Sequence, residues 1–196
     1  LCAACQDKPR PWDGPADSGA RRTNCEPFLP KTASASPSSL VAPASPKSKE
    51  GGLWSSCYRG FRTSRNATTD TVRLGMLCGP ITGMRKIGET HAGTLSEDEP
   101  TKRVPFAVER GGCYRVFAAA ARQSSSPLDL DLSILSSRSS RLAQDTTESV
   151  WAALPADKAL CTFAKDSFEV QIEVQDEALD DKPTWAVEIW QLPPTH

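Results

Sequence analysis

A strict alternation of apolar and polar residues is the most constraining feature of this sequence. It is clearest along residues 168–174, where Phe, Val, Ile and Val alternate with Glu, Gln and Glu. A period of two places apolar side chains on one face of a β-strand and polar ones on the other. The same type of pattern, less regular in places, recurs along residues 104–108, 113–118, 128–134 and 185–190.

These segments predict a mainly β domain over residues 85–196. With shorter apolar runs near 85–95, 151–154 and 159–163, we expect about seven or eight strands. Turn signals such as Gly111-Gly112 separate them, and no segment is long enough to be a crossover helix. Parallel strands need such crossovers. The predicted fold is therefore an antiparallel β-sandwich.

Residues 53–84 predict a short helical cap in front of this domain. Its first piece is a short amphipathic stretch over residues 53–61. The second begins at Asn66 or Thr69, either of which is a favourable N-cap, and stops at Gly79-Pro80. We expect this second helix to pack on the β-domain beside it.

The N-terminal residues suggest a lipid-anchored protein. Ala3-Ala4-Cys5 resembles the cleavage box of bacterial lipoproteins, so we expect residues 1–5 to be a signal-peptide remnant and lipobox, with Cys5 lipidated. Residues 6–52 are rich in Pro and Ser, which predicts a disordered linker. The rival interpretation takes Cys2 and Cys5 as a redox or metal-binding C-x-x-C pair, although the prolines that follow oppose the helix such a motif needs.

Five cysteines remain if Cys2 leaves with the signal peptide and Cys5 carries lipid. An oxidising compartment would allow disulfides. Cys57 and Cys78 lie on the two adjacent helical pieces, while Cys113 and Cys161 lie on strand segments, so we expect the bridges Cys57–Cys78 and Cys113–Cys161. Cys25 is then left over, and the alternative is that all of them are reduced thiols in a cytosolic protein.

Two stretches carry a resemblance to a known family. These are Gly111–Val116, together with the strand before it, and Leu128–Leu135, followed by two alternating strands. They resemble the bacterial pre-peptidase C-terminal domain family, although Asp166-Ser167-Phe168 stands where that family usually has a Gly. The resemblance implies a jelly-roll-like sandwich on a secreted protein, without catalytic residues. Cys78-Gly79-Pro80 and Gly83-Met84 in turn resemble uncharacterised secreted proteins of myxobacterial type.

Two ligand-binding hypotheses follow from the strands. Asp129 and Asp131 fall on the same face of one strand and, with Asp145 or Glu109, form a candidate Ca²⁺ site. The alternative is that the two carboxylates simply solvate the outer face of the sheet. No other metal or cofactor is expected.

The tryptophans of the last strand carry the second hypothesis. Trp185 shares a face with Val187 and Ile189 and is expected in the core. Trp190 lies on the opposite face with Glu188, which makes it a candidate exposed anchor for glycan or protein.

The sequence favours a non-catalytic role. The chain has no G-x-S-x-G motif, and His91 is its only non-terminal histidine, which we read as an ordinary surface residue. A net charge of -1 gives no reason to expect a nucleic-acid surface. We therefore expect a cell-envelope lipoprotein, membrane-attached through Cys5, whose sandwich is structural or binds an envelope protein or polysaccharide. The alternative is a secreted accessory domain that binds a glycan or protein polymer, assisted by calcium.

Overall fold

The computed structural model describes residues 52–124, 128–145, 147–174 and 179–193, so Cys5, Cys25 and the expected linker up to residue 51 lie outside these ranges. The described ranges form nine strands, two α-helices and two short 3-10 helices. The strands are β1 (Arg85–Thr94), β2 (Thr101–Val108), β3 (Cys113–Ala121), β4 (Leu130–Leu135), β5 (Arg141–Gln144), β6 (Trp151–Leu154), β7 (Leu160–Cys161), β8 (Asp166–Val174) and β9 (Thr184–Leu192). The helical elements are α1 (Leu53–Ser56), α2 (Ala67–Cys78), η1 (Pro80–Thr82) and η2 (Leu179–Asp181).

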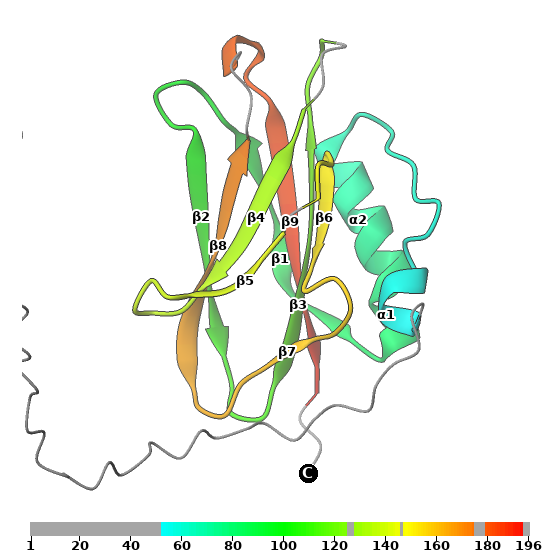
Figure 1. Ribbon diagram of the computed structural model, residues 1–196, viewed down its shortest axis with the longest axis vertical. Helices are drawn as coiled ribbons and strands as arrows, with labels where there is room; N and C mark the ends of the chain where they lie inside the picture. Colours follow the sequence, from blue (N-terminus) through cyan, green and yellow to red (C-terminus); the bar gives the residue numbers. More distant parts are fainter. Residues whose placement is uncertain (1–51, 125–127, 146, 175–178, 194–196) are drawn as a thin grey trace, which may run out of the picture. The chain divides into compact units, whose positions relative to one another are not determined.

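The strands form two antiparallel sheets packed face to face, which confirms the predicted sandwich (Figure 1). One sheet has the order β1-β9-β3-β6, with β7 also paired to β3, and the other has the order β2-β8-β4-β5. The chain crosses between the sheets at most connections, and this strand order is that of a jelly roll. The alternation does not predict β5, because this short strand is largely exposed and lies at the edge of its sheet.

The alternation of β2 and β8 corresponds to burial on one face only. Val170 and Ile172 of β8 are fully buried between the sheets, while the polar residues between them are half-buried on the outer face. Val104 of β2 pairs with Val170 in register, so the apolar faces of the two strands coincide. A single slip in register would turn this apolar face to water, which is why the pattern fixes the pairing.

The central strands β3 and β9 are buried on both faces. In β3, Tyr114, Val116 and Ala118 belong to the core between the sheets. The alternate positions, including Arg115 and Phe117, face the other way and are also fully buried. Something must therefore cover the outer side of the β1-β9-β3-β6 sheet.

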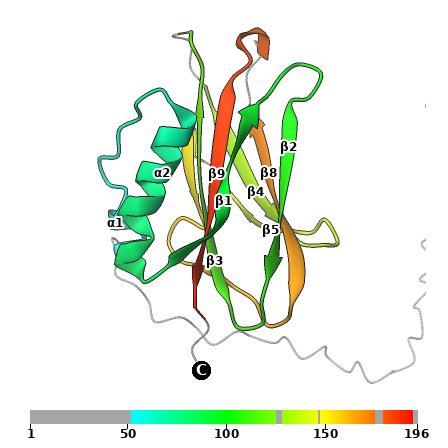
Figure 2. The ribbon, with the colours of Figure 1, turned by 180° about the vertical axis from the view of Figure 1, so that it is seen from behind.

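The helical cap supplies this cover, as Figures 1 and 2 show. Helix α2 packs on β9, β3 and β1 through a buried stripe that includes Thr71, Leu74 and Cys78. The Asn66 side chain caps this helix by accepting a hydrogen bond from the Thr69 N–H, at 2.9 Å. Asn66 is thus the N-cap, and the helix ends before Gly79, as predicted.

The side chain of Arg115, on β3, connects the sheet to the cap through hydrogen bonds. Its guanidinium is completely buried and donates to the carbonyl oxygens of Trp54 (2.7 Å), Pro155 (3.0 Å) and Ala156 (2.6 Å). The rings of Trp54 and Phe117 lie 5.5 Å and 5.2 Å from its central carbon, at cation–π distance. Burial lowers the pKa of Arg115 to about 10, with nearby Tyr58 and Asp157 opposing this shift, so the side chain stays charged at neutral pH.

Both expected disulfides are present. Cys57–Cys78 joins the end of α1 to the end of α2, and Cys113–Cys161 joins β3 to β7. The bridged cysteines are 21 and 48 residues apart in sequence. By loop entropy, bridges of these lengths stabilise the folded state by about 3 and 4 kcal/mol.

We predict that Arg115→Met lowers the free energy of unfolding by about 2–4 kcal/mol, because three carbonyl oxygens lose a charged donor while staying in place. Urea unfolding measures this loss, and hydrogen exchange over residues 53–61 should show a loosened α1. Arg103→Met is the matched control. The Arg103 side chain is 53% exposed and forms an ion pair with Glu169 at 3.5 Å on the solvent-facing side of β2 and β8. Its replacement should therefore change stability by less than about 0.5 kcal/mol. Equal stability of the two variants would contradict the role given to Arg115.

Candidate functional site

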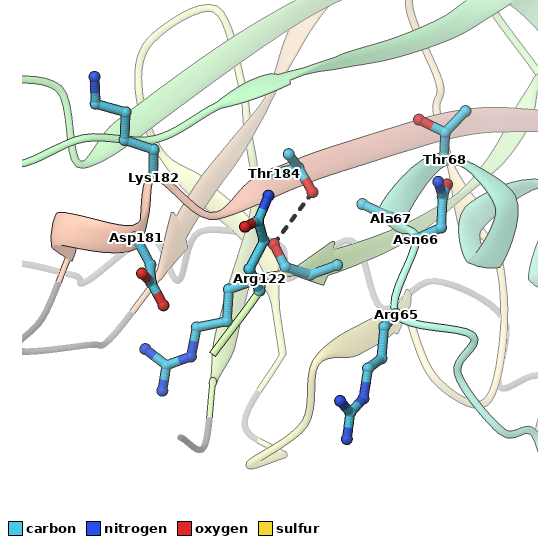
Figure 3. A pocket seen from close by; sticks show the side chains of 10 residues that line it. Arg65, Asn66, Ala67, Thr68, Arg122, Asp181, Lys182 and Thr184 are labelled. Atoms are coloured by element: carbon cyan, nitrogen blue, oxygen red, sulfur yellow. Dashed lines mark hydrogen bonds between the residues drawn. The ribbon is translucent and has the colours of Figure 1, made fainter. Parts of the chain in front are cut away.

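A cavity of about 490 Å³ opens at the N-terminal end of α2 (Figure 3). It lies where this end of the helix meets the end of β3 and the start of β9. Three segments far apart in sequence therefore form its walls. The lining residues are Arg65, Asn66, Ala67, Thr68, Ala121, Arg122, Gln123, Asp181, Lys182 and Thr184.

The helix supplies one wall through its first residues. Arg65 has a left-handed backbone (φ 63°), which turns the chain into Asn66 and the first turn of α2. The Asn66 side chain satisfies the N–H of Thr69, but the first N–H groups of a helix have no partner within the helix itself. These groups give the helix end a partial positive charge that favours anions.

The two strands supply the other wall. Thr184 at the start of β9 donates its hydroxyl proton to the carbonyl oxygen of Ala121 at the end of β3, at 3.1 Å. Lys182 precedes β9 with φ 45°, also left-handed. Asp181 is held at the rim, where its carboxylate accepts a hydrogen bond from the N–H of Ser124.

The charge of the lining is mainly positive. Three basic side chains, Arg65, Arg122 and Lys182, face one acidic side chain, Asp181. In Figure 3 the two guanidinium groups extend to the same side of the cavity, whereas the Lys182 ammonium extends to the opposite side. Basic side chains and a helix N-terminus are the groups that bind a carboxylate, sulfate or phosphate group in proteins.

The expectation that Trp190 is an exposed anchor is wrong. Its side chain does lie on the opposite face of β9 from Val187 and Ile189, but it is only 4% exposed because α2 covers that face. A Cβ atom at Gly79, directly after the helix, would overlap the Trp190 ring. Trp185 is in the core between the sheets, as expected.

Glu188 shares the covered face with Trp190. Its carboxylate accepts hydrogen bonds from the Trp190 indole (3.0 Å) and the Thr90 hydroxyl (2.7 Å), and it forms an ion pair with Lys86 (2.8 Å). A glutamate in this strand therefore does not signal a solvent-exposed face, because its charge is compensated beneath the helix.

The aspartates of the proposed calcium site are used locally. Asp129, just before β4, accepts a hydrogen bond from the Ser149 N–H at 2.8 Å. Asp131 lies opposite Glu173 of β8, and Asp145 accepts hydrogen bonds from Thr147. Glu109 follows the far end of β2 and pairs with Lys165. No group of three His, Cys, Asp or Glu side chains close enough to hold a metal ion occurs among residues the structure describes. Calcium binding stays an untested prediction.

No pattern in the sequence indicates the basic cavity. Arg65, Arg122 and Lys182 each flank a helix or strand, but their spacing carries no motif, and only the jelly-roll topology brings them together. The one signal was Asn66, whose role as N-cap located the helix end that forms the first wall. His91 is exposed on β1, as predicted, and does not line this cavity.

Comparisons with known proteins add no family assignment. No protein-family model matches the chain, and a search of curated proteins gave no significant match. The resemblance to the pre-peptidase C-terminal domain family therefore stays a prediction. In the part of the chain that the structure describes, no helix combines the length and the apolar character needed to span a bilayer.

We predict that Gly79→Ala destabilises the protein by about 1–3 kcal/mol, because the new methyl group must displace the buried Trp190 ring. Chemical unfolding followed by tryptophan fluorescence measures the change. Thr69→Ala, at an exposed position of the same helix, is the control and should change stability by less than about 0.5 kcal/mol. A Gly79→Ala variant as stable as the parent would mean that α2 does not cover Trp190 tightly.

Proposed function

We propose that this protein is a non-catalytic lipoprotein of the bacterial cell envelope, lipidated at Cys5, whose β-sandwich has a binding or structural role. The observation that carries the proposal is the pair of disulfides, Cys57–Cys78 and Cys113–Cys161. Disulfides form and persist in oxidising compartments such as the bacterial periplasm and are rare in the cytosol. A mature protein in such a compartment has passed through export, which is consistent with residues 1–5 being a signal-peptide remnant and lipobox.

The lipobox interpretation also explains why Cys5 lies in a different sequence context from the four bridged cysteines. The four bridged cysteines belong to the folded domain, where each is held opposite its partner. Cys5 precedes a Pro- and Ser-rich stretch of the kind that links an anchor to a domain.

Intact-mass spectrometry of the protein from its native membrane fraction tests this proposal. We expect an N-terminus at Cys5 with added acyl mass, and a gain of two hydrogens per disulfide, hence four in all, on reduction. A soluble protein that retains Leu1 and Cys2 and gains no hydrogens would overturn it. Cys2 and Cys5 would then be better interpreted as a redox or metal-binding C-x-x-C pair than as part of a lipobox.

The basic cavity favours a second candidate function, the binding of an acidic polymer in the envelope or outside the cell. Three basic side chains and a helix end line it, and a uronic-acid polysaccharide carries repeated carboxylates that suit such a lining. This candidate is compatible with either a lipid-anchored or a secreted protein, because it concerns the folded domain alone.

We predict that the protein binds polygalacturonate in a salt-dependent manner and does not bind neutral dextran. The double variant Arg65→Asn/Lys182→Asn should weaken binding about tenfold, because it removes two cationic groups while Asn tolerates the left-handed backbone. Arg110→Asn/Lys158→Asn makes the same change in net charge at exposed positions outside the cavity and should bind like the parent. Equal weakening by both pairs would show that only net charge matters.

A further inference from the structure

The outer surface of the helical cap is unusually apolar. The structure's described residues include seven exposed large hydrophobic side chains, and five of them belong to the cap. We call these five the cap face: Leu53 (56% exposed), Val72 (37%), Met76 (61%), Leu77 (48%) and Ile81 (53%). Single exposed hydrophobic residues are ordinary, but their concentration on α1, α2 and the short 3-10 helix after them is typical of an interaction surface.

Packing within the domain does not explain the cap face. The side of α2 that faces the sheet is already formed by a separate buried stripe, which includes Ala67, Leu74 and Cys78. Val72 and Met76 lie one turn apart on the opposite side, where a surface helix usually carries polar residues. The apolar character of these positions therefore serves something other than the fold.

The charge of the cap is equally one-sided. Residues 53–84 hold four basic side chains and one acidic side chain, whereas residues 85–196 hold twelve basic and eighteen acidic ones. The single acid, Asp70, is buried and pairs with Arg73 at 3.3 Å. Every exposed charge on the cap is thus an arginine: Arg59, Arg62, Arg65 and Arg73.

The basic and apolar side chains share one surface. Arg73 lies three and four residues before Met76 and Leu77, so the three side chains are neighbours on α2. Arg73 also donates to the carbonyl oxygen of Arg62 at 3.3 Å and lies over the Phe61 ring at 5.4 Å. The segment between α1 and α2, with its arginines, is in this way held against the exposed side of the helix.

We infer that the cap face docks on an anionic lipid surface. Arginines next to exposed Leu, Ile and Met, without an exposed acid, are the combination by which interfacial helices bind anionic bilayers. The inference rests on the proposed function, because the segment bearing Cys5 enters the domain at Gly52, directly before α1 and the cap face. Residues 1–51 carry seven basic and five acidic side chains, so their charge does not suit them to cover this basic surface.

The test uses the full chain with Cys5→Ser, so that any membrane binding comes from the cap and not from an acyl chain. Co-sedimentation should show binding to phosphatidylcholine vesicles that contain phosphatidylglycerol, decreasing with salt, and no binding to phosphatidylcholine alone. Leu77→Asp/Ile81→Asp should weaken binding at least tenfold, because it removes apolar contact and adds repulsion. Arg59→Gln/Arg62→Gln should weaken binding about tenfold and reduce its salt dependence.

The matched control is Leu142→Asp/Phe163→Asp, which also replaces two exposed large hydrophobic residues by Asp, at the two such positions outside the cap that the structure describes. This variant should bind like the parent, and circular dichroism should show that all variants are folded. Failure of the parent to bind phosphatidylglycerol vesicles, or equal loss in both Asp pairs, would overturn the inference. So would a concentration-dependent doubling of mass that Leu77→Asp/Ile81→Asp abolishes, because a second copy would then cover the cap face. The Cys5→Ser chain keeps these outcomes separate from lipidation, which the intact mass of the native protein decides.

Discussion

A buried arginine is the constraint on which the arrangement of this domain depends. Arg115 is the third residue of β3, one of the two central strands of its sheet, and its side chain points away from the sandwich core. A cation in that position is tolerable only if its donors are satisfied where water is absent. The carbonyl oxygens of α1 and of the segment after β6 satisfy them, so the cap must close over the sheet for the strand to be stable. Sheet and cap are thereby one cooperative unit.

The sequence predicts those parts of the fold where one face of a strand meets water. In β2 and β8 the polarity alternates with burial, and both strands were expected at nearly their observed positions. The central strands follow a different rule, because both of their faces are covered. Glu188 and Trp190 lie on the same face of β9, and a glutamate there suggests that this face is exposed to solvent. Helix α2 nevertheless buries both side chains, and the ion pair with Lys86 compensates the charge of the Glu188 carboxylate. Sequence periodicity indicates that the two faces of a strand differ in polarity, but it does not indicate which elements pack on each face.

The basic cavity was beyond the reach of sequence reasoning for a topological reason. Arg65, Arg122 and Lys182 come from three connections whose ends meet only because β9 lies between β1 and β3. Local signals placed Asn66 at the start of a helix, but nothing local states which strand ends lie beside that start. The two disulfides were easier to predict from the sequence, because each joins neighbouring elements that the hydrophobic pattern had already identified.

Charge is distributed unevenly over the domain, although the net charge of the whole chain is only -1. The cap is basic and the β-sandwich is acidic, so an anionic surface attracts one side of the domain and repels the other. Over distances of about 8–10 Å this preference survives screening at physiological salt, which is enough to orient a domain already held close to a membrane. The basic cavity lies at the N-terminal end of α2, while α1 and the apolar residues Leu77 and Ile81 lie at its other end. A cap that docks mainly through the latter end would leave the cavity at the edge of the contact, accessible to a soluble acidic ligand.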